Sequence, residues 1–223
     1  MTSSPTWRRR WTRSERLAAA EPRWRDPIAF YATHAARFDA ARSRAFSERD
    51  WLAAFLALLP PGGTVLDLGC GMGEPMAAQM LARGFRVTGV DATTALLERA
   101  RTRLPAGEWI EADMRGLDLR RRFDGILAWD SFFHLSGAAQ RACIATFAAH
   151  AGPGCALMFN SGGAEGEAVN PLFGEPLYHA SLAPDDYRAL LAGHGFRVVR
   201  HVASDPACGG RTVWLAQRKD IEE

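Results

Sequence analysis

Cysteine is scarce in this sequence, and lysine is almost absent. The four cysteines, at positions 70, 143, 155 and 208, form no C-x-x-C pair and have no spacing typical of a metal site. We therefore expect reduced thiols in a cytoplasmic protein, and neither a disulfide framework nor a metal centre. Lys219 is the single lysine among 27 basic residues, and we interpret this bias toward arginine as the coding habit of a GC-rich bacterium.

Long apolar runs are also lacking. The longest, residues 51–59, is far shorter than the roughly 18 residues that a helix needs to cross a bilayer, so no membrane span is expected. The arginines at 8–10 are followed by no extended apolar segment, and an export signal is therefore not expected either.

The net charge is small, +2 over 223 residues, but it is unevenly spread. Residues 1–26 hold seven arginines and three acidic residues, a net of +4, which leaves about −2 for the remainder. A mildly acidic remainder argues against tight binding to nucleic acid phosphates. The tryptophans among the first arginines suit nucleic acid or an anionic membrane, but we favour a disordered basic extension over 1–26.

From residue 64 onward, strand-like and helix-like segments alternate. Short apolar runs predict strands at 64–68, 86–90, 108–111, 125–128 and 156–159, with helices at 75–83, 94–103 and 137–149 between them. This alternation predicts a doubly wound, parallel α/β sheet that binds ligands at the carboxyl ends of its strands. Helices are expected at 28–45, 48–58 and 184–194, and further strands at 196–203 and 211–217.

Length and apolar content predict one folded domain. With 48% apolar residues, the chain can bury a full core over 27–223, with the first helices as an N-terminal cap.

The most informative motif follows the first expected strand, where Asp67 precedes a G-x-G-x-G turn at 69–73. The next apolar run ends at Asp91, an arrangement typical of a βαβ unit that binds an adenosine-containing cofactor. A dinucleotide fingerprint requires its third glycine at position 74, where this chain has Glu74. A carboxylate there repels a pyrophosphate but favours the cationic S-adenosylmethionine.

These residues resemble those of the class I S-adenosylmethionine-dependent methyltransferases, best over residues 60–160. In that family the glycine turn wraps the methionine part of the cofactor, and the acid that ends the second strand, here Asp91, binds the ribose. Asp113 and Met114 match the adenine contacts after the third strand, and Asp130 matches the end of the fourth. Each of these two acids, taken alone, is equally well explained as a helix cap.

The resemblance implies a Rossmann-like seven-stranded sheet, mostly parallel, with an antiparallel C-terminal hairpin. It also implies S-adenosyl-L-methionine as cofactor and S-adenosyl-L-homocysteine as product. The residues that it implies for cofactor binding are Tyr31, Asp67, Gly69, Cys70, Gly71, Gly73, Asp91, Ala92, Asp113, Met114, Trp129 and Asp130. For Tyr31, which resembles a tyrosine that reaches the cofactor carboxylate in some relatives, a core-facing helix position is an equal alternative.

Two histidines are candidate catalytic residues. Methyl transfer is an in-line displacement that depends mainly on positioning, and a base is needed only if the acceptor loses a proton. His134, four residues after Asp130, has an ordinary pKa near ~6.5 that suits this role, and packing against the next helix is the alternative. His179 is the second candidate, and an ordinary position at a strand edge explains it equally well.

The acceptor is expected to be a small metabolite. The Asn/Asp-Pro-Pro-Tyr/Phe motif of enzymes that methylate amino nitrogens is missing after the fourth strand, where residues 130–133 are Asp-Ser-Phe-Phe. We expect an aromatic cavity walled by Trp129, Phe132, Phe133, Phe173 and Tyr178. Arg211 is a candidate anchor for a carboxylate, with a solvated hairpin arginine as the alternative. Whether oxygen, nitrogen or sulfur is methylated stays open.

The function predicted from the sequence is therefore methyl transfer to a small molecule in a bacterial, cytoplasmic enzyme that is a monomer or homodimer. Three alternatives remain at this point. They are a cofactor-binding protein of the same fold without catalysis, a nucleotide-dependent oxidoreductase, and a nucleic acid methyltransferase assisted by the basic N-terminal segment.

Overall fold

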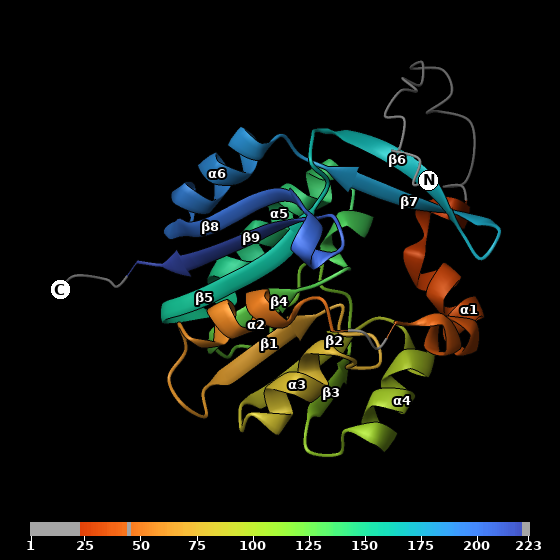
Figure 1. Cartoon of the computed structure of the whole chain (residues 1–223), viewed down its shortest axis with the longest axis horizontal. Coiled ribbons are helices and arrows are strands. Elements are labelled where there is room, and N and C mark those ends of the chain that lie inside the picture. The colour runs from red at the N-terminus through yellow and green to blue at the C-terminus, as the bar shows by residue number, and fades with distance from the viewer. Residues whose placement is uncertain (1–22, 44–45, 220–223) are drawn as a thin grey trace.

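The computed structural model describes residues 23–43 and 46–219 (Figure 1). Most of the predicted basic extension, residues 1–22, lies outside this range. The last residues of the extension form a 3-10 turn, η1 (Arg23–Arg25). Asp26 then caps α1 (Pro27–Ala41) by accepting a hydrogen bond from Ala29 N (3.0 Å). Among the described residues, no helix is both long and apolar enough to span a bilayer.

Seven strands form one sheet in the order β3-β2-β1-β4-β5-β9-β8. The strands are β1 (Thr64–Leu68), β2 (Arg86–Asp91), β3 (Glu108–Glu111), β4 (Phe123–Ala128), β5 (Ala151–Ser161), β8 (Phe196–Asp205) and β9 (Arg211–Arg218). The first five pair in parallel, and β9 is antiparallel to both β5 and β8. The predicted Rossmann-like sheet with an antiparallel C-terminal hairpin is thus confirmed.

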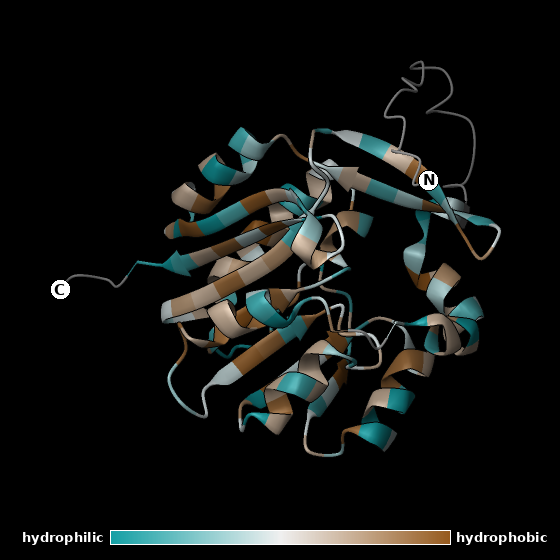
Figure 2. Ribbon diagram, viewed as in Figure 1, coloured by the Kyte–Doolittle hydropathy of each residue, from teal (hydrophilic) through white to brown (hydrophobic). Residues whose placement is uncertain are grey.

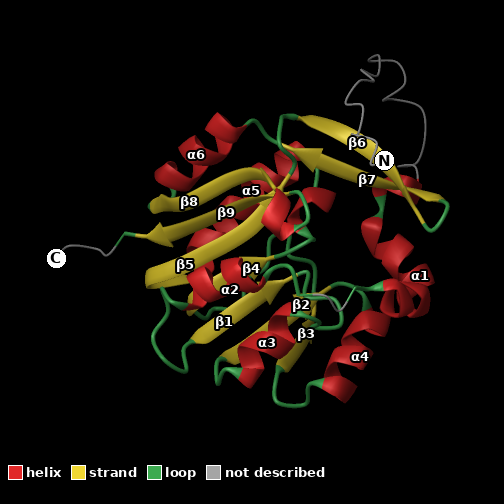
Figure 3. Ribbon diagram, viewed as in Figure 1, coloured by secondary structure: helices red, strands yellow, loops and turns green. Residues whose placement is uncertain are grey.

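Helices cover both faces of the sheet (Figure 3). They are α2 (Arg49–Leu56), α3 (Met76–Ala82), α4 (Thr94–Arg103), α5 (Gly137–His150) and α6 (Pro184–Gly193), whereas α1 (Pro27–Ala41) lies to one side, against α4. Residues of α2, α3 and α4 pack into one core with Val65, Leu127 and Met158, while α5 and α6 pack into the other with Leu66 and Phe159. Figure 2 shows the apolar strands lying between helices whose outer faces are polar.

The strand order reverses between β1 and β4, because β2 and β3 continue on one side and β5 on the other. At such a switch point the loops after neighbouring strands diverge and leave a crevice at their carboxyl ends. The fold therefore directs the two most informative loops, after β1 and after β4, toward the same crevice.

A second sheet, the hairpin of β6 (Gly166–Leu172) and β7 (Glu175–Ser181), was not expected from the sequence. Its two connecting residues, Phe173 and Gly174, both have positive φ (58° and 87°), as a tight type I′ turn requires. Strand β6 alternates between exposed and half-buried residues and carries Pro171, so its apolar signal is weak. The hairpin lies above α1, away from the main sheet (Figure 1).

Candidate active site

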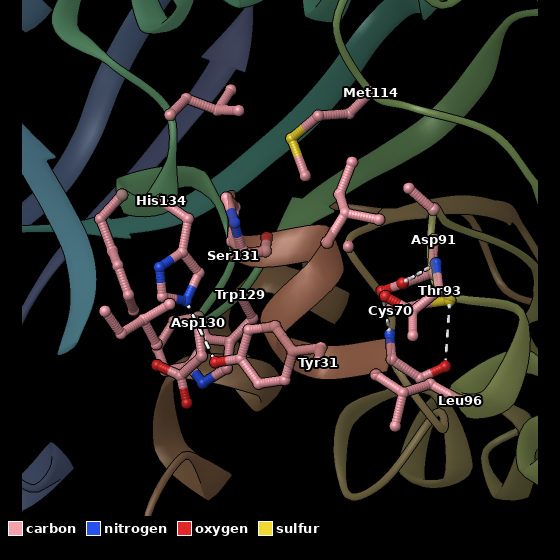
Figure 4. Close-up of a pocket in the computed structure, with 18 of the residues that line it drawn as sticks. Tyr31, Cys70, Asp91, Thr93, Leu96, Met114, Trp129, Asp130, Ser131 and His134 are labelled. Atoms are coloured by element: carbon pink, nitrogen blue, oxygen red, sulfur yellow. Dashed lines mark hydrogen bonds between the residues drawn. The ribbon is translucent and has the colours of Figure 1, made fainter. Parts of the chain in front are cut away.

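A cavity of about 640 Å³ opens at the carboxyl ends of β1, β2 and β4. The glycine turn and the loops after β2 and β3 form one end. The other end is formed by α1, the hairpin β6–β7 and the short 3-10 helix η2 (Phe132–His134). Figure 4 shows how side chains from these separate elements face the same space.

The turn after β1 needs glycine because a neighbouring loop lies against it. Gly69 has φ +70°, and a Cβ added there would lie 2.3 Å from Ser131 Cβ. Ser131 is held in this position because its Oγ donates a hydrogen bond to the Leu68 carbonyl (2.7 Å). The close approach of the two loops leaves the backbone of the turn exposed to the cavity.

Asp91 holds the glycine turn in place from the end of β2. Its Oδ2 accepts a hydrogen bond from Gly71 N (2.8 Å), and its Oδ1 accepts one from Thr93 N (2.8 Å). Burial raises the pKa of this carboxyl despite these hydrogen bonds. The Thr93 side chain contributes a further hydrogen bond, and the lone pairs that remain can accept hydrogen bonds from a ligand.

This end of the cavity is acidic. Burial, followed by the charge of Asp91, raises the pKa of Asp67 to about 7. Asp113 also lies on the wall, where burial alone would raise its pKa, but the hydrogen bonds and charge of Arg115 lower it. A cationic ligand stabilises such partly uncompensated carboxylates, whereas an anionic ligand is repelled by them.

Asp130 joins five parts of the fold. Its carboxylate accepts two hydrogen bonds from Arg211 on β9 (both 2.8 Å) and one from Asn160 on β5 (2.7 Å). Arg42, just after α1, lies 3.2 Å from Oδ2, and Arg211 also lies 3.4 Å from Glu48, just before α2. Burial alone would raise the pKa of Asp130, but the hydrogen bonds and charge of Arg211 keep it low. The acid is therefore ionised and fixes the cavity wall on either side of it.

Tyr31 and His134 meet at the other end of the cavity. The Tyr31 hydroxyl lies 3.1 Å from His134 Nε2, and His134 Nδ1 lies 3.0 Å from the Tyr178 carbonyl (Figure 4). A carbonyl only accepts, so Nδ1 of His134 carries the proton and Nε2 accepts the Tyr31 hydroxyl. Burial, and then the neighbouring His179, lower the pKa of His134 to about 4, which keeps the ring neutral at pH 7.

The twelve residues predicted for the cofactor all lie on this cavity wall. His134, His179, Phe133 and Tyr178 also line it. The roles predicted for these residues stay predictions. For Tyr31, the pairing of its hydroxyl with His134 is a contact that the sequence did not indicate.

Three residues predicted for the acceptor lie elsewhere. Phe132 is fully buried in the core beside Phe147 and Phe159, since the turn of η2 directs it away from the cavity. Arg211 lies behind Asp130, whose carboxylate its guanidinium engages through two hydrogen bonds. Phe173 sits in the hairpin turn and does not line the cavity. The expectation that Phe132 and Phe173 form the aromatic wall was wrong, and the structure gives Arg211 a partner within the protein in place of the solvated position offered as its alternative.

Several wall residues were not predicted, among them Arg42, Thr93 and Ser131. Thr93 follows Asp91 closely in sequence, and the pattern of an acid two residues ahead of a helix N-cap is a usable signal for it. Arg42 and Ser131 act through contacts with residues about 60 to 90 positions away, which no local pattern reveals.

Comparison with known proteins agrees with this geometry. Residues 65–154 match the family described as a methyltransferase domain. Over 83 residues the chain is 41% identical to the trans-aconitate 2-methyltransferase of Paracidovorax citrulli, a stretch that covers 35% of this chain and 29% of that protein. The matched residues identify a methyltransferase domain, as the resemblance noted from the sequence implied. The matched stretch is less than a third of the curated relatives' length, so it identifies this domain alone.

Solved structures share the fold of this methyltransferase domain. The 1,6-didemethyltoxoflavin-N1-methyltransferase of Burkholderia thailandensis has a TM-score of 0.69 at 22% identity, covering 92% of this chain and 93% of its own. The amino pentose methyltransferase CalS10 of Micromonospora echinaspora has a TM-score of 0.65 at 22% identity, covering 84% and 96%. The first was solved with its acceptor and S-adenosylhomocysteine, and the second with S-adenosylmethionine.

The cavity of the methyltransferase domain fits S-adenosylmethionine. Its acidic end suits a sulfonium and an ammonium group, and Asp91 has lone pairs for ribose hydroxyls. In addition, the ring N–H of Trp129 is buried on the wall without a partner among the described residues. A buried donor of this kind is costly unless a ligand or water accepts its hydrogen bond.

Proposed function

We propose that this chain transfers the methyl group of S-adenosylmethionine to a small molecule bound in the same cavity. The observation that carries the proposal is the composition of the cavity, whose acidic end at the glycine turn leads directly to an end lined by Tyr31, His134 and Tyr178. When bound, the cofactor supplies a methyl group already activated by a sulfonium leaving group.

In this proposal Asp67, Asp91 and the turn at 69–73 hold the cofactor. Asp67 balances its positive charge, and the carboxylate of Asp91 accepts hydrogen bonds from the ribose hydroxyls. Glu74 supports the choice of cofactor, because it lies on the wall where a dinucleotide would place its pyrophosphate. The pairing of Glu74 with Arg103 (3.1 Å) reduces this repulsion only partly, because Arg103 also binds Asp39.

The residues at the other end position the acceptor. The hairpin β6–β7 and α1 cover this end, and they are tied together by Arg37, which donates to the Phe173 carbonyl (3.1 Å), while His34 Nε2 lies 3.1 Å from the Glu175 carboxylate. This covered, aromatic space suits a small molecule better than a polynucleotide. Positioning of the two reactants within such a space supplies most of the rate of an in-line transfer.

The test is incubation with S-adenosylmethionine labelled in its methyl group and a bacterial metabolite extract, followed by identification of the labelled product. We expect one or a few labelled small molecules and none with boiled protein. An Asp91→Ala variant should lose most of the labelling, and Asp118→Ala, an exposed acid outside the cavity, is the matched control. Labelling that is confined to added RNA or DNA would contradict the proposal.

A further inference from the structure

We infer that the methyl acceptor bears its proton on the atom that is methylated, as a hydroxyl or a ring N–H does, and is not a carboxylate. The inference rests on the proposed function, since it concerns the acceptor of that same reaction. It follows from the direction of the hydrogen bonds around two histidines.

The first histidine fixes the direction of the Tyr31 hydroxyl. His134 Nδ1 donates to the Tyr178 carbonyl (3.0 Å), so its Nε2 has only a lone pair. The Tyr31 hydroxyl, 3.1 Å away, must therefore give its single proton to Nε2. What Tyr31 offers to the cavity is then the lone pairs of its oxygen, which accept a hydrogen bond.

The second histidine, His179, likewise has a hydrogen-bond acceptor at its Nε2. His179 Nδ1 lies 3.1 Å from the Leu177 carbonyl, which makes Nδ1 the donor and leaves Nε2 without a proton. The Asn170 amide, at 3.4 Å from the same Nδ1, is the longer contact and does not change this assignment. The rings of His179 and His134 lie 4.8 Å apart, and both line the cavity. One part of the wall thus presents two hydrogen-bond acceptors.

The cationic groups on the wall are matched by carboxylates of the protein itself. Arg25 lies 3.3 Å from Glu167, Arg42 lies 3.2 Å from Asp130, and Arg115 is bound to Asp113. A carboxylate acceptor would face lone pairs at Tyr31 and His179 and would compete for these guanidinium groups. The Trp129 N–H does not distinguish the two kinds of methyl acceptor, because the oxygen of a hydroxyl and the oxygen of a carboxylate can both accept its hydrogen bond.

The same arrangement removes the proton. As the acceptor atom bonds to the methyl carbon with its own lone pair, the carbon–sulfur bond breaks and its electron pair goes to sulfur. The acceptor's proton passes to the Tyr31 oxygen while the Tyr31 proton passes to His134 Nε2. A hydroxyl or ring N–H becomes strongly acidic as it is methylated, so even a weakly basic, buried imidazole accepts its proton.

The first experiment measures the tautomers directly. Long-range ¹H–¹⁵N spectra are recorded on protein labelled in its histidines, and the signals are assigned with the variants His134→Gln and His179→Gln. The rings of His134 and His179 should both be protonated at Nδ1 and unprotonated at Nε2. His150 is an internal control, because Thr146 and Leu119 fix its ring in the same tautomer outside the cavity. A proton on Nε2 of His134 or His179 overturns the inference.

The second experiment compares acceptors. Phenol and hydroxypyridine probes are incubated with labelled S-adenosylmethionine beside trans-aconitate and benzoate, and Tyr31→Phe is compared with the unaltered protein. We expect methylation of the O–H or N–H probes only, and a loss of about 100-fold or more in turnover for Tyr31→Phe. Preferential methylation of the carboxylates overturns the inference. The inference is also overturned if the protein binds S-adenosylhomocysteine but methylates neither the O–H or N–H probes nor the carboxylates. Failure to bind S-adenosylhomocysteine contradicts the proposed function itself.

Discussion

A single methyl group at Gly69 should disrupt both the stability and the ligand binding of this domain. At φ +70° an alanine costs about 1–2 kcal/mol in backbone conformation alone. Its Cβ would lie 2.3 Å from Ser131 Cβ, a separation that forces the loop after β4 to move. That movement breaks the Ser131–Leu68 hydrogen bond, about 1 kcal/mol, and adds the cost of overpacking, about 1–3 kcal/mol. Together these effects predict that Gly69→Ala lowers the free energy of unfolding by about 3–6 kcal/mol.

Gly84→Ala provides the matched control. Gly84 has a similar φ of +83°, but a Cβ there meets nothing within 4 Å. Only the backbone cost remains, so we expect a loss of about 1–2 kcal/mol. Urea unfolding of both variants isolates the contribution of the contact between the two loops.

Calorimetry with S-adenosylhomocysteine completes the test. The movement of the loops should weaken binding to Gly69→Ala by about tenfold or more, which is about 1.4 kcal/mol, and leave Gly84→Ala unchanged. Equal losses of stability in the two variants would refute the contribution of the contact between the loops, and unaltered affinity in Gly69→Ala would refute the assignment of this turn to the cofactor.

Three further predictions concern the same cavity. Because the pKa of Asp67 is raised to about 7 by burial and then by Asp91, S-adenosylmethionine should bind more tightly as pH rises from 6 to 8, and calorimetry should show this dependence lost in Asp67→Asn. The ligand-free protein should lose stability over the same rise, since its folded state keeps a proton that the unfolded chain has released. Arg211→Met should lower the free energy of unfolding by about 2–4 kcal/mol at pH 7, because the buried Asp130 then keeps only Arg42 and Asn160 as partners; the low pKa of Asp130 means that the loss must shrink in urea titrations at pH 3. Phe132→Leu should lower the free energy of unfolding by about 1–2 kcal/mol and leave the KM for the methyl acceptor unchanged, whereas Phe133→Leu should raise that KM. The reverse result would show that Phe132, and not Phe133, contacts the acceptor.

The main sheet was predictable because its strands are short apolar runs that end in turn residues. Val65 to Leu68 and Val87 to Val90 are buried on both faces of the sheet, so their apolar signal does not depend on periodicity. Strand β5 is longer than predicted, since Gly152, Pro153 and Gly154 concealed its beginning. The hairpin β6–β7 gave no clear signal, because it is only half-buried and packs against the N-terminal helix.

The glycine turn and Asp91 could be located from sequence because 20 residues or so of one βαβ unit contain both. The partners of Asp130 could not, as Arg211 is 81 positions away and Arg42 is 88. The same holds for Tyr31, which reaches His134 across 103 positions. Local sequence therefore predicted the cofactor end of the cavity better than the acceptor end, which is assembled from distant elements.

The most direct measurement of the central claim is competition between cofactors for the cavity. In calorimetry the protein should bind S-adenosylhomocysteine at one site per chain, S-adenosylmethionine should displace it, and Asp91→Ala should weaken it strongly. NAD(H) should give no heat of binding, because Glu74 lies where its pyrophosphate would sit. Binding of NAD(H) together with no response to S-adenosylhomocysteine would contradict the account.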